Sequence, residues 1–206
     1  MTYIVREIFA SLQGEGVQSG RVAVFLRFAG CNLWSGREAD RITARCRFCD
    51  TDFVGGERYG DAESLADAVA AAWPAQDGVN RLAIVTGGEP GLQLDDALIA
   101  ALHRRGFAVA VETNGTLPLP SGLDWVCVSP KAGTDLVVTR GDELKLVYPQ
   151  VGAAPEDFEH LDFTHFLLQP MDGPERAANT DAALRHCLSR PRWRLGLQLH
   201  KSLGLR

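Results

Sequence analysis

The sequence predicts an α/β fold in the form of an incomplete TIM-type barrel, with mostly parallel strands and about three main helices. Two observations lead to this class. Runs of Val, Ile and Leu that are apolar at nearly every position alternate with segments of helical spacing, as in a parallel sheet buried on both faces. Helical patterns are also fewer than strand patterns, roughly three against six. The barrel is therefore expected to be open.

The expected strands are short apolar runs that end in glycine or polar residues. The first, VAVFLRF at 22–28, stops just before Gly30 and Cys31. The others are expected at 82–86, 107–111, 125–128, 144–147 and 166–168, with a final strand near 193–199. Arg27 alternates with Leu26 in the first strand, so we expect its side chain to point into the barrel.

Three helices are expected between the strands. Asp61 is a suitable N-cap for the first, and Pro74 ends it. The second ends at Gly106, and the third covers roughly 181–189. The apolar faces follow a spacing of four residues: Leu65, Val69 and Trp73 in the first helix, and Leu94, Leu98 and Leu102 in the second.

Polar clusters follow five of the expected strands. They are the cysteine-containing loop and the segments TGGEP, ETNG, SPK and QPMDG. Each alone is compatible with an ordinary turn. Because ligands of parallel α/β folds collect at the carboxyl ends of the strands, five such clusters at one edge predict a binding site there.

The composition restricts the classes of protein to which this chain can belong. The chain has 206 residues, 46% of them hydrophobic and 23% charged, and a net charge of -5, which suits one globular domain over 1–206. It has no long basic run for nucleic acid and no apolar run near the ~20 residues that span a membrane. Arg6 and Glu7 interrupt the N-terminal apolar stretch, so no signal peptide is expected. Five cysteines, an odd number, indicate reduced thiols in the cytoplasm.

Three of these cysteines, Cys31, Cys46 and Cys49, form the pattern C-x14-C-x2-C. Thiolates at such spacing hold zinc or iron. A structural zinc site or an electron-carrying cluster takes four protein ligands, whereas Cys127 and Cys187 lie far along the chain. Three thiolates on a four-iron cluster leave one iron open to a small molecule. An open cluster is therefore favoured, with a zinc-binding structural module and an electron carrier as alternatives.

These residues resemble the radical S-adenosylmethionine (SAM) superfamily. Phe48 lies inside the two-residue gap, and Gly87-Gly88-Glu89-Pro90 follows the next strand. Most of that superfamily has C-x3-C-x2-C. The longer first gap, together with LQGEG at 12–16, resembles the 7-carboxy-7-deazaguanine synthase family, and the likeness extends to the closing LQLHK. It implies a single radical SAM domain over 1–206 with an inserted cluster loop at 31–49, in which a short helix is expected.

The resemblance also implies cofactors. Cys31, Cys46 and Cys49 would hold one [4Fe–4S] cluster and serve as the catalytic residues, with SAM on the open iron. A magnesium ion is implied at Thr51. Glu112 is a polar neighbour of this pocket. The residues implied to contact SAM are Phe48, Cys49, Asp50, Gly88, Ser129, Pro130, Lys131, Gln169, Pro170, Met171 and Asp172.

The substrate implied by the resemblance is 6-carboxy-5,6,7,8-tetrahydropterin, a flat ring that bears a carboxylate. Glu15 would accept hydrogen bonds from the ring, and Arg27 would grip the carboxylate in a two-pronged pair. Arg27 has a plainer reading, as an arginine paired with a nearby acid. The full set of implied substrate contacts is Leu12, Gln13, Gly14, Glu15, Arg27, Thr86, His200 and Arg206.

The implied reaction is a radical ring contraction to 7-carboxy-7-deazaguanine with loss of ammonia, a step of queuosine and 7-deazapurine biosynthesis. The enzyme would be a lyase that regenerates SAM, requires magnesium and receives one electron from an external reductant. A homodimer that binds neither nucleic acid nor membranes is implied. A radical SAM activase acting on a partner protein stays open as an alternative. Cys127 and Cys187 are expected to be buried structural thiols.

Overall fold

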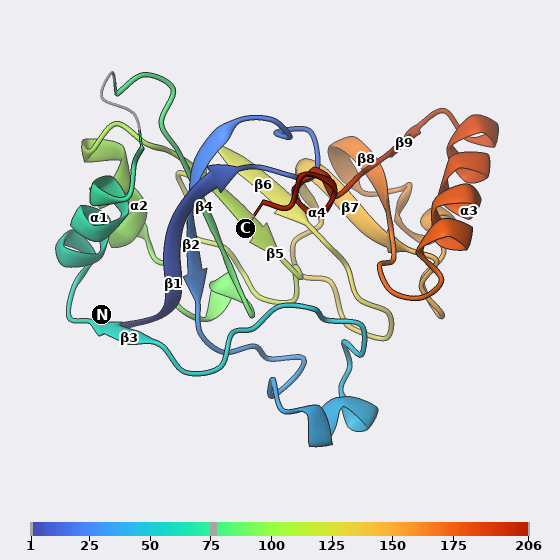
Figure 1. The fold of residues 1–206 in the computed structure, drawn as a ribbon, viewed down its shortest axis with the longest axis horizontal. Helices are drawn as coiled ribbons and strands as arrows, with labels where there is room; N and C mark the ends of the chain where they lie inside the picture. Colours follow the sequence, from blue (N-terminus) through green and yellow to red (C-terminus); the bar gives the residue numbers. More distant parts are fainter. Residues whose placement is uncertain (1, 75–77, 206) are drawn as a thin grey trace.

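The computed structural model describes residues 2–74 and 78–205. In these residues nine strands form one sheet (Figure 1). The strands are β1 (Tyr3–Leu12), β2 (Val22–Phe28), β3 (Glu57–Tyr59), β4 (Leu82–Gly87), β5 (Ala108–Thr113), β6 (Trp125–Val128), β7 (Arg140–Tyr148), β8 (Asp162–Pro170) and β9 (Trp193–Leu195). Their order in the sheet is β3-β1-β2-β4-β5-β6-β7-β8-β9.

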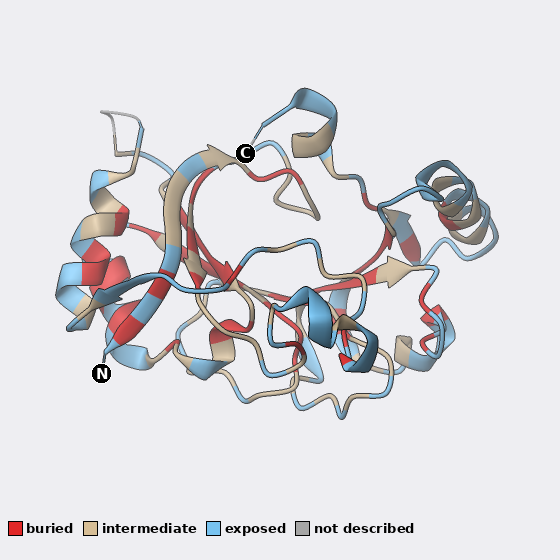
Figure 2. Ribbon diagram, turned by 60° about the horizontal axis from the view of Figure 1, so that its bottom comes forward, coloured by how far each residue is buried: buried red, intermediate tan, exposed pale blue. Residues whose placement is uncertain are grey.

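The pairing of the strands makes the sheet an open, partial barrel. From β2 through β9 every neighbouring pair is parallel. At the other edge β1 pairs antiparallel with both β2 and β3. Figure 2 shows the sheet curling without closing. The predicted fold class, a mostly parallel and incomplete barrel, is confirmed.

Four α-helices accompany the sheet in the described residues: α1 (Ala62–Ala71), α2 (Asp96–Arg104), α3 (Arg176–Ser189) and the short α4 (Leu199–Leu203). Helices α1 and α2 pack on each other and on β1 and β5, while α3 packs on β8 and β9. Short 3-10 turns lie at η1 (Glu38–Thr43), η2 (Pro90–Leu92) and η3 (Pro155–Phe158). None of the helices described is long and apolar enough to span a membrane.

Strand alternation separates a helix-facing side of the sheet from an inner side. On β4, Ala83 and Val85 belong to the core shared with α1 and α2. Ile84 belongs to a second apolar cluster between the strands, and Thr86, two residues on, lines a cavity. Since side chains two apart on a strand share a face, the inner face changes from apolar to polar toward the carboxyl ends. The inner apolar cluster that contains Ile84 therefore occupies one end of the barrel, and the cavity occupies the other.

Most predicted elements are present. The observed helix boundaries differ from the predicted ones by a few residues at their ends. Asp61 caps α1 through the backbone N–H of Ser64 at 2.8 Å, but α1 ends before Trp73. Asp95 caps α2 by accepting from Leu98 N–H, so Leu94 precedes that helix. Both apolar residues still pack into the core next to the helices. Helix α3 begins five residues before the predicted 181, at Arg176.

At the ends of the chain one strand was missed and one prediction was wrong. Strand β1 was not predicted, and its burial alternates from Tyr3 to Arg6, as in a strand with one buried face. The final strand ends at Leu195 and not at 199. Its continuation leaves the sheet because Leu199 N–H donates to Gly14 O at 2.8 Å. His200 is consequently on a helix and does not alternate along a strand.

Candidate active site

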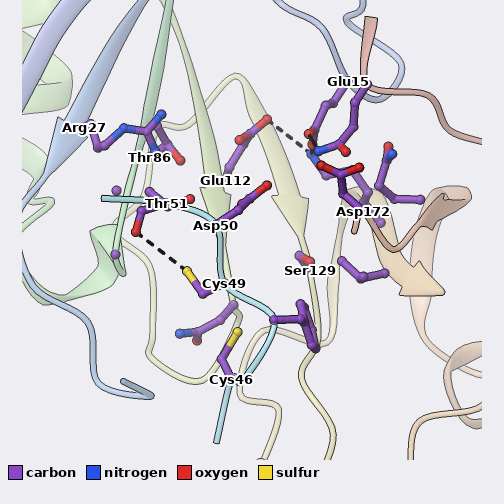
Figure 3. A pocket seen from close by; sticks show the side chains of 18 of the residues that line it. Glu15, Arg27, Cys46, Cys49, Asp50, Thr51, Thr86, Glu112, Ser129 and Asp172 are labelled. Carbon is purple, nitrogen blue, oxygen red and sulfur yellow. Dashed lines mark hydrogen bonds and ion pairs between the residues drawn. The ribbon is translucent and has the colours of Figure 1, made fainter. Parts of the chain in front are cut away.

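A cavity of about 660 Å³ opens at the carboxyl ends of the parallel strands. The loops after β2, β4, β5, β6 and β8 all contribute to its lining, together with the loop after β1 and helix α4. Figure 3 shows Cys46 and Cys49 at one end, Arg27 with Thr86 on one side and Glu15 on another. The five polar clusters noted in the sequence thus meet around one space.

Nearly all of the predicted site residues line this cavity. Pro130 does not: it is buried, and its carbonyl oxygen accepts from Gln150 Nε2 at 3.4 Å. The predicted contact of Arg206 lies outside the described residues.

The three cysteines lie at one end of the cavity. Cys31 and Cys49 pack against a small apolar cluster centred on Trp34 and Phe53, whose rings meet edge to face with centroids 5.6 Å apart. Arg41 stacks on Trp34 at 4.1 Å. The inserted segment after Cys31 therefore has its own small core, which supports the loop that carries the thiols.

Arg41 also binds the cysteine turn directly. Its Nη1 donates to the carbonyl oxygens of Arg47, at 2.8 Å, and Cys49, at 3.0 Å. Arg41 lies on η1, the short helix predicted within the insertion. The insertion thus fixes the backbone on which Cys46 and Cys49 are placed, which explains how a long first gap is compatible with a defined thiol geometry.

The three thiols differ in pKa. The hydrogen bond between Cys46 and Cys49 lowers the pKa of Cys49 to about 6 and raises that of Cys46, and burial raises that of Cys31. Within the described chain no three His, Cys, Asp or Glu side chains converge as ligands of one metal ion do. A four-iron cluster takes one thiolate per iron. By residue type and number, the three cysteines fit three of its four irons.

Gly87 and Gly88 bring two strand ends together. A Cβ on Gly88 would overlap the carbonyl oxygen of Gly30 and lie 2.8 Å from the Cβ of Cys31, and one on Gly87 would overlap Phe28 O. Gly87 also has a φ of 144°, which favours glycine. These glycines were expected to make room for SAM. The structure gives them a prior role, since they let β4 approach the residue before Cys31.

Glu89 connects β4 to β5 beneath the cavity. Its side chain is fully buried and accepts from Thr113 Oγ1 at 2.7 Å, Asn114 N–H at 2.8 Å and Gly91 N–H at 2.8 Å. Burial raises its pKa despite these bonds. One carboxylate therefore fixes the TGGEP and ETNG segments relative to each other.

The side of the cavity predicted for SAM has polar groups directed into it. Lys131 Nζ donates to Ser129 Oγ at 2.7 Å and lies 5.8 Å from the centre of the Phe48 ring. Burial lowers the pKa of Lys131. Gln169 is buried, and its Oε1 has no hydrogen-bond partner among the described residues.

The glycines of LQGEG make room for side chains from distant segments. A Cβ on Gly14 would overlap the His200 ring, and one on Gly16 would overlap the Glu143 carboxylate. Gly16 also has a φ of 67°. The two glycines of this motif therefore allow the loop after β1 to pack closely against β7 and α4.

A buried ionic network, which we call the carboxylate wall, lies beside this loop. Lys145 Nζ is 2.7 Å from Glu15 Oε2 and 3.4 Å from Glu112 Oε1. Gln13 Nε2 donates to Glu112 Oε1 at 2.8 Å, and Gln198 Nε2 donates to Glu15 Oε1 at 2.7 Å. Burial raises the pKa of Glu15, but Lys145 and these hydrogen bonds outweigh it and lower that pKa to about 2. The wall therefore presents an ionised Glu15 to the cavity.

Arg27 lies across the cavity from this wall. It pairs with Thr86 in the parallel register of β2 and β4, and Figure 3 shows the two side chains together. Its Nε donates to Glu7 Oε1 at 2.8 Å, so the ordinary ion pair that the sequence left open is present. The guanidinium group also lines the cavity, as does Thr51.

Helix α4 crosses the mouth of the cavity. Lys201 Nζ lies 2.7 Å from both Asp50 Oδ2 and Asp172 Oδ2. These two acids belong to the cysteine loop and to the loop after β8, so one lysine connects three segments that are far apart in the sequence. His200 lines the cavity from the same helix.

Several cavity residues were not predicted: Lys145, Gln198, Lys201 and Glu7, while Cys127 was expected only as a buried thiol. Lys145 was detectable, because Glu143 and Lys145 alternate with Leu144 and Leu146, and a charged row on a buried strand indicates an inner face. Cys127 is buried as expected, with Sγ 3.6 Å from Glu143 Oε1.

Comparisons with known proteins agree with this geometry. A model of the radical SAM superfamily matches residues 41–147. The 7-carboxy-7-deazaguanine synthases of Bradyrhizobium diazoefficiens and Bordetella pertussis are 64% and 60% identical to this chain, each over the full length of both chains. The crystal structure of QueE from Escherichia coli superposes with a TM-score of 0.75 and 26% identity, covering 97% of this chain and 95% of that one.

The matches extend from end to end of both chains, so the matched region includes the cysteine loop, the segments of the carboxylate wall and α4. The superfamily model covers more than half of the chain, including Cys46 and Cys49. The chain therefore belongs to the radical SAM superfamily and, within it, to the 7-carboxy-7-deazaguanine synthase family.

Proposed function

We propose that this protein converts 6-carboxy-5,6,7,8-tetrahydropterin to 7-carboxy-7-deazaguanine with loss of ammonia. The observation that carries the proposal is that one cavity brings together three cysteines at one end, an arginine on one side and a wall of carboxylates on another. A carboxylate-bearing pterin has a carboxylate that the arginine can bind and ring N–H groups that can donate to the wall of carboxylates. Full-length relatives named for this product support the same assignment.

Membership of the superfamily implies a [4Fe–4S] cluster and SAM. Cys31, Cys46 and Cys49 are the residues that would hold the cluster. When bound, the two together supply a carbon radical by reductive cleavage of the sulfonium, using one electron from an external reductant. The chain's own contribution is to position the substrate and to exclude water, which α4 does by crossing the cavity mouth.

For the substrate, the proposal assigns opposite sides of the cavity to its two ends. The guanidinium group of Arg27 binds the carboxylate through its terminal nitrogens while Glu7 holds Nε. Glu15 accepts from the ring N–H groups, as do the backbone carbonyls near Gln13 and Gly14. Thr51 contributes one hydroxyl to a magnesium ion whose other ligands are substrate oxygens and water. We further propose a cytoplasmic homodimer that acts as a single domain over 1–206.

Anaerobic reconstitution followed by assay tests the proposal. We expect a brown protein with roughly four irons per chain that consumes the carboxypterin in the presence of SAM, magnesium and a low-potential reductant. The product is identified by mass spectrometry as the deazaguanine, with one equivalent of ammonia. SAM should not be consumed in proportion to product.

Other outcomes would assign a different function. A colourless protein with one zinc per chain would support the structural module. A protein that contains iron and cleaves SAM but forms no product from the carboxypterin would keep its place in the superfamily. That outcome would overturn the proposed substrate. Leaving out magnesium should reduce the rate strongly, and an unchanged rate would remove Thr51 from the proposal.

A further inference from the structure

Lys145 lies at the centre of the carboxylate wall. Its side chain is only 7% exposed, and it comes from the middle of β7. The titratable groups that interact with it are Glu15 after β1, Glu112 on β5, Cys127 on β6, Lys131 after β6 and Glu143 on β7 itself. His200 on α4 acts on Glu15. A buried lysine is costly unless its charge is paired. Here one ammonium group forms ion pairs with two carboxylates, those of Glu15 and Glu112.

Lys145 also determines how two carboxylates are oriented. Glu15 is held at both oxygens, by Gln198 at Oε1 and by Lys145 at Oε2. Glu112 receives both Gln13 and Lys145 at Oε1, and neither of these bonds reaches Oε2. Each carboxylate is thus held by one amide and by the same ammonium group, so the lysine is the group they share.

We propose that Lys145 is a positioning residue for the ring end of the pterin: its ammonium group holds the carboxylates of Glu15 and Glu112 aligned as acceptors for the ring N–H groups. This inference rests on the proposed function. It assigns no proton transfer to Lys145 and no contact with the reacting carbon. Its role is exerted through the two carboxylates.

The inference has a consequence in acid solution. In the native chain Lys145 and the amide donors overcome the effect of burial and hold the pKa of Glu15 at about 2. Without Lys145, burial acts against fewer favourable interactions. The pKa of Glu15 should then rise, above the ordinary 4.5 of a glutamate if burial dominates. Substrate binding that needs the carboxylate would fail at a higher pH than in the native enzyme.

The test uses the reconstituted holoenzyme with Lys145→Met and Lys145→Arg. Methionine retains bulk without charge, and arginine retains charge. The matched control is Arg105→Met, since Arg105 also bridges two acids, Glu63 at 2.9 Å and Asp67 at 2.7 Å, on the helical side of the sheet. For Lys145→Met we expect unchanged iron content, an unchanged KM for SAM, and a KM for the carboxypterin raised about 10- to 100-fold. The acid limb of kcat/KM should move to higher pH, with partial recovery in Lys145→Arg.

A second readout does not depend on turnover. Glutamate labelled with ¹³C at the carboxyl carbon reports the titration of Glu15, whose resonance is assigned by its absence from Glu15→Gln. We expect that titration to move to higher pH in Lys145→Met and to stay low in the Arg105→Met control. If Lys145→Met does not fold, the titration of Glu15 and the KM for the carboxypterin are measured in Lys145→Arg. The KM alone is measured in Glu15→Gln/Lys145→Met, where a neutral residue 15 should make the loss of Lys145 less harmful.

The outcomes separate the inference from the proposed function. A native enzyme that gives no deazaguanine overturns the proposed function and with it the positioning of the pterin, while the titration still decides whether Lys145 controls the charge of Glu15. An active native enzyme whose Lys145→Met variant keeps its KM and pH profile overturns the inference alone. Equal losses for SAM and the carboxypterin would indicate a merely structural role and would also overturn it.

Discussion

The cysteine loop and the carboxylate wall face the same cavity but are built differently. The loop is local: Arg41 binds the carbonyl of Cys49, eight residues on, and a small aromatic cluster supports it. The wall is assembled from distant segments, since Glu15 and Lys145 are 130 residues apart. A short stretch of chain can therefore encode metal chemistry, whereas recognition of a substrate's ring requires the completed barrel. Substitutions in the two regions should consequently differ in what they change.

The largest effect is expected from a substitution that disables the cysteine end of the cavity and leaves the carboxylate wall intact. Cys46→Ser replaces a thiolate by a hydroxyl that stays protonated at neutral pH, so the cluster loses one of its three protein ligands. We expect loss of iron and complete loss of product, with substrate affinity at the wall retained in a binding assay. Cys187→Ser, on α3, is the control and should keep its iron. Full iron in Cys46→Ser would contradict the assignment of this thiol.

Gly88→Ala should have the next largest effect, on the cysteine loop. Its new Cβ would overlap Gly30 O, a backbone atom that cannot rotate away. We expect a loss of about 1–3 kcal/mol in the free energy of unfolding and lower iron content, because Cys31 is displaced. Gly60→Ala is the control, since nothing lies within 4 Å of its Cβ. Chemical denaturation and iron analysis give both quantities.

Gly14→Ala tests the opposite side of the cavity. The clash here is with the His200 ring and is partly relieved by movement of α4, so the loss of stability should be smaller, about 1–2 kcal/mol. The KM for the carboxypterin should rise while iron content and the KM for SAM stay constant. A variant that lost iron instead would show that the two regions are not independent.

The smallest effect is expected where the two regions are joined. Lys201→Met removes ion pairs that are partly exposed, which contribute roughly 0.2–1 kcal/mol each. Lys201 lowers the pKa of Asp172 below its ordinary 3.8. That contribution is present above the ordinary value and is lost as the pH falls through the lowered one. The stability gap between native and variant should therefore be largest near neutral pH and close in acid, measured by thermal unfolding across pH. A constant gap would exclude Asp172 as the source.

The same contrast explains what could be predicted from the sequence. Buried runs such as β2 and β6 have the boundaries expected of them, because a continuous apolar strand is a local pattern. The cysteines and the glycines beside them were recognisable by spacing. Lys201 was not recognisable. Lys145 was recognisable only as a charge on the inner face of a buried strand, because nothing near it in the sequence indicates its partners. Pro130 does not line the cavity, whereas its neighbours in SPK, Ser129 and Lys131, do, so its contact with SAM stays a prediction.

Local patterns thus determined the strands, the capped helices, the order of elements and the three thiols, since these depend on interactions between residues close in the chain. Only the tertiary structure decided that β1 joins the sheet edge, that the chain leaves β9 to form α4 over the cavity, and that Lys145 pairs with Glu15 and Glu112. Those features depend on contacts across the barrel. Such contacts exist only once the sheet has curled and brought the ends of its strands together.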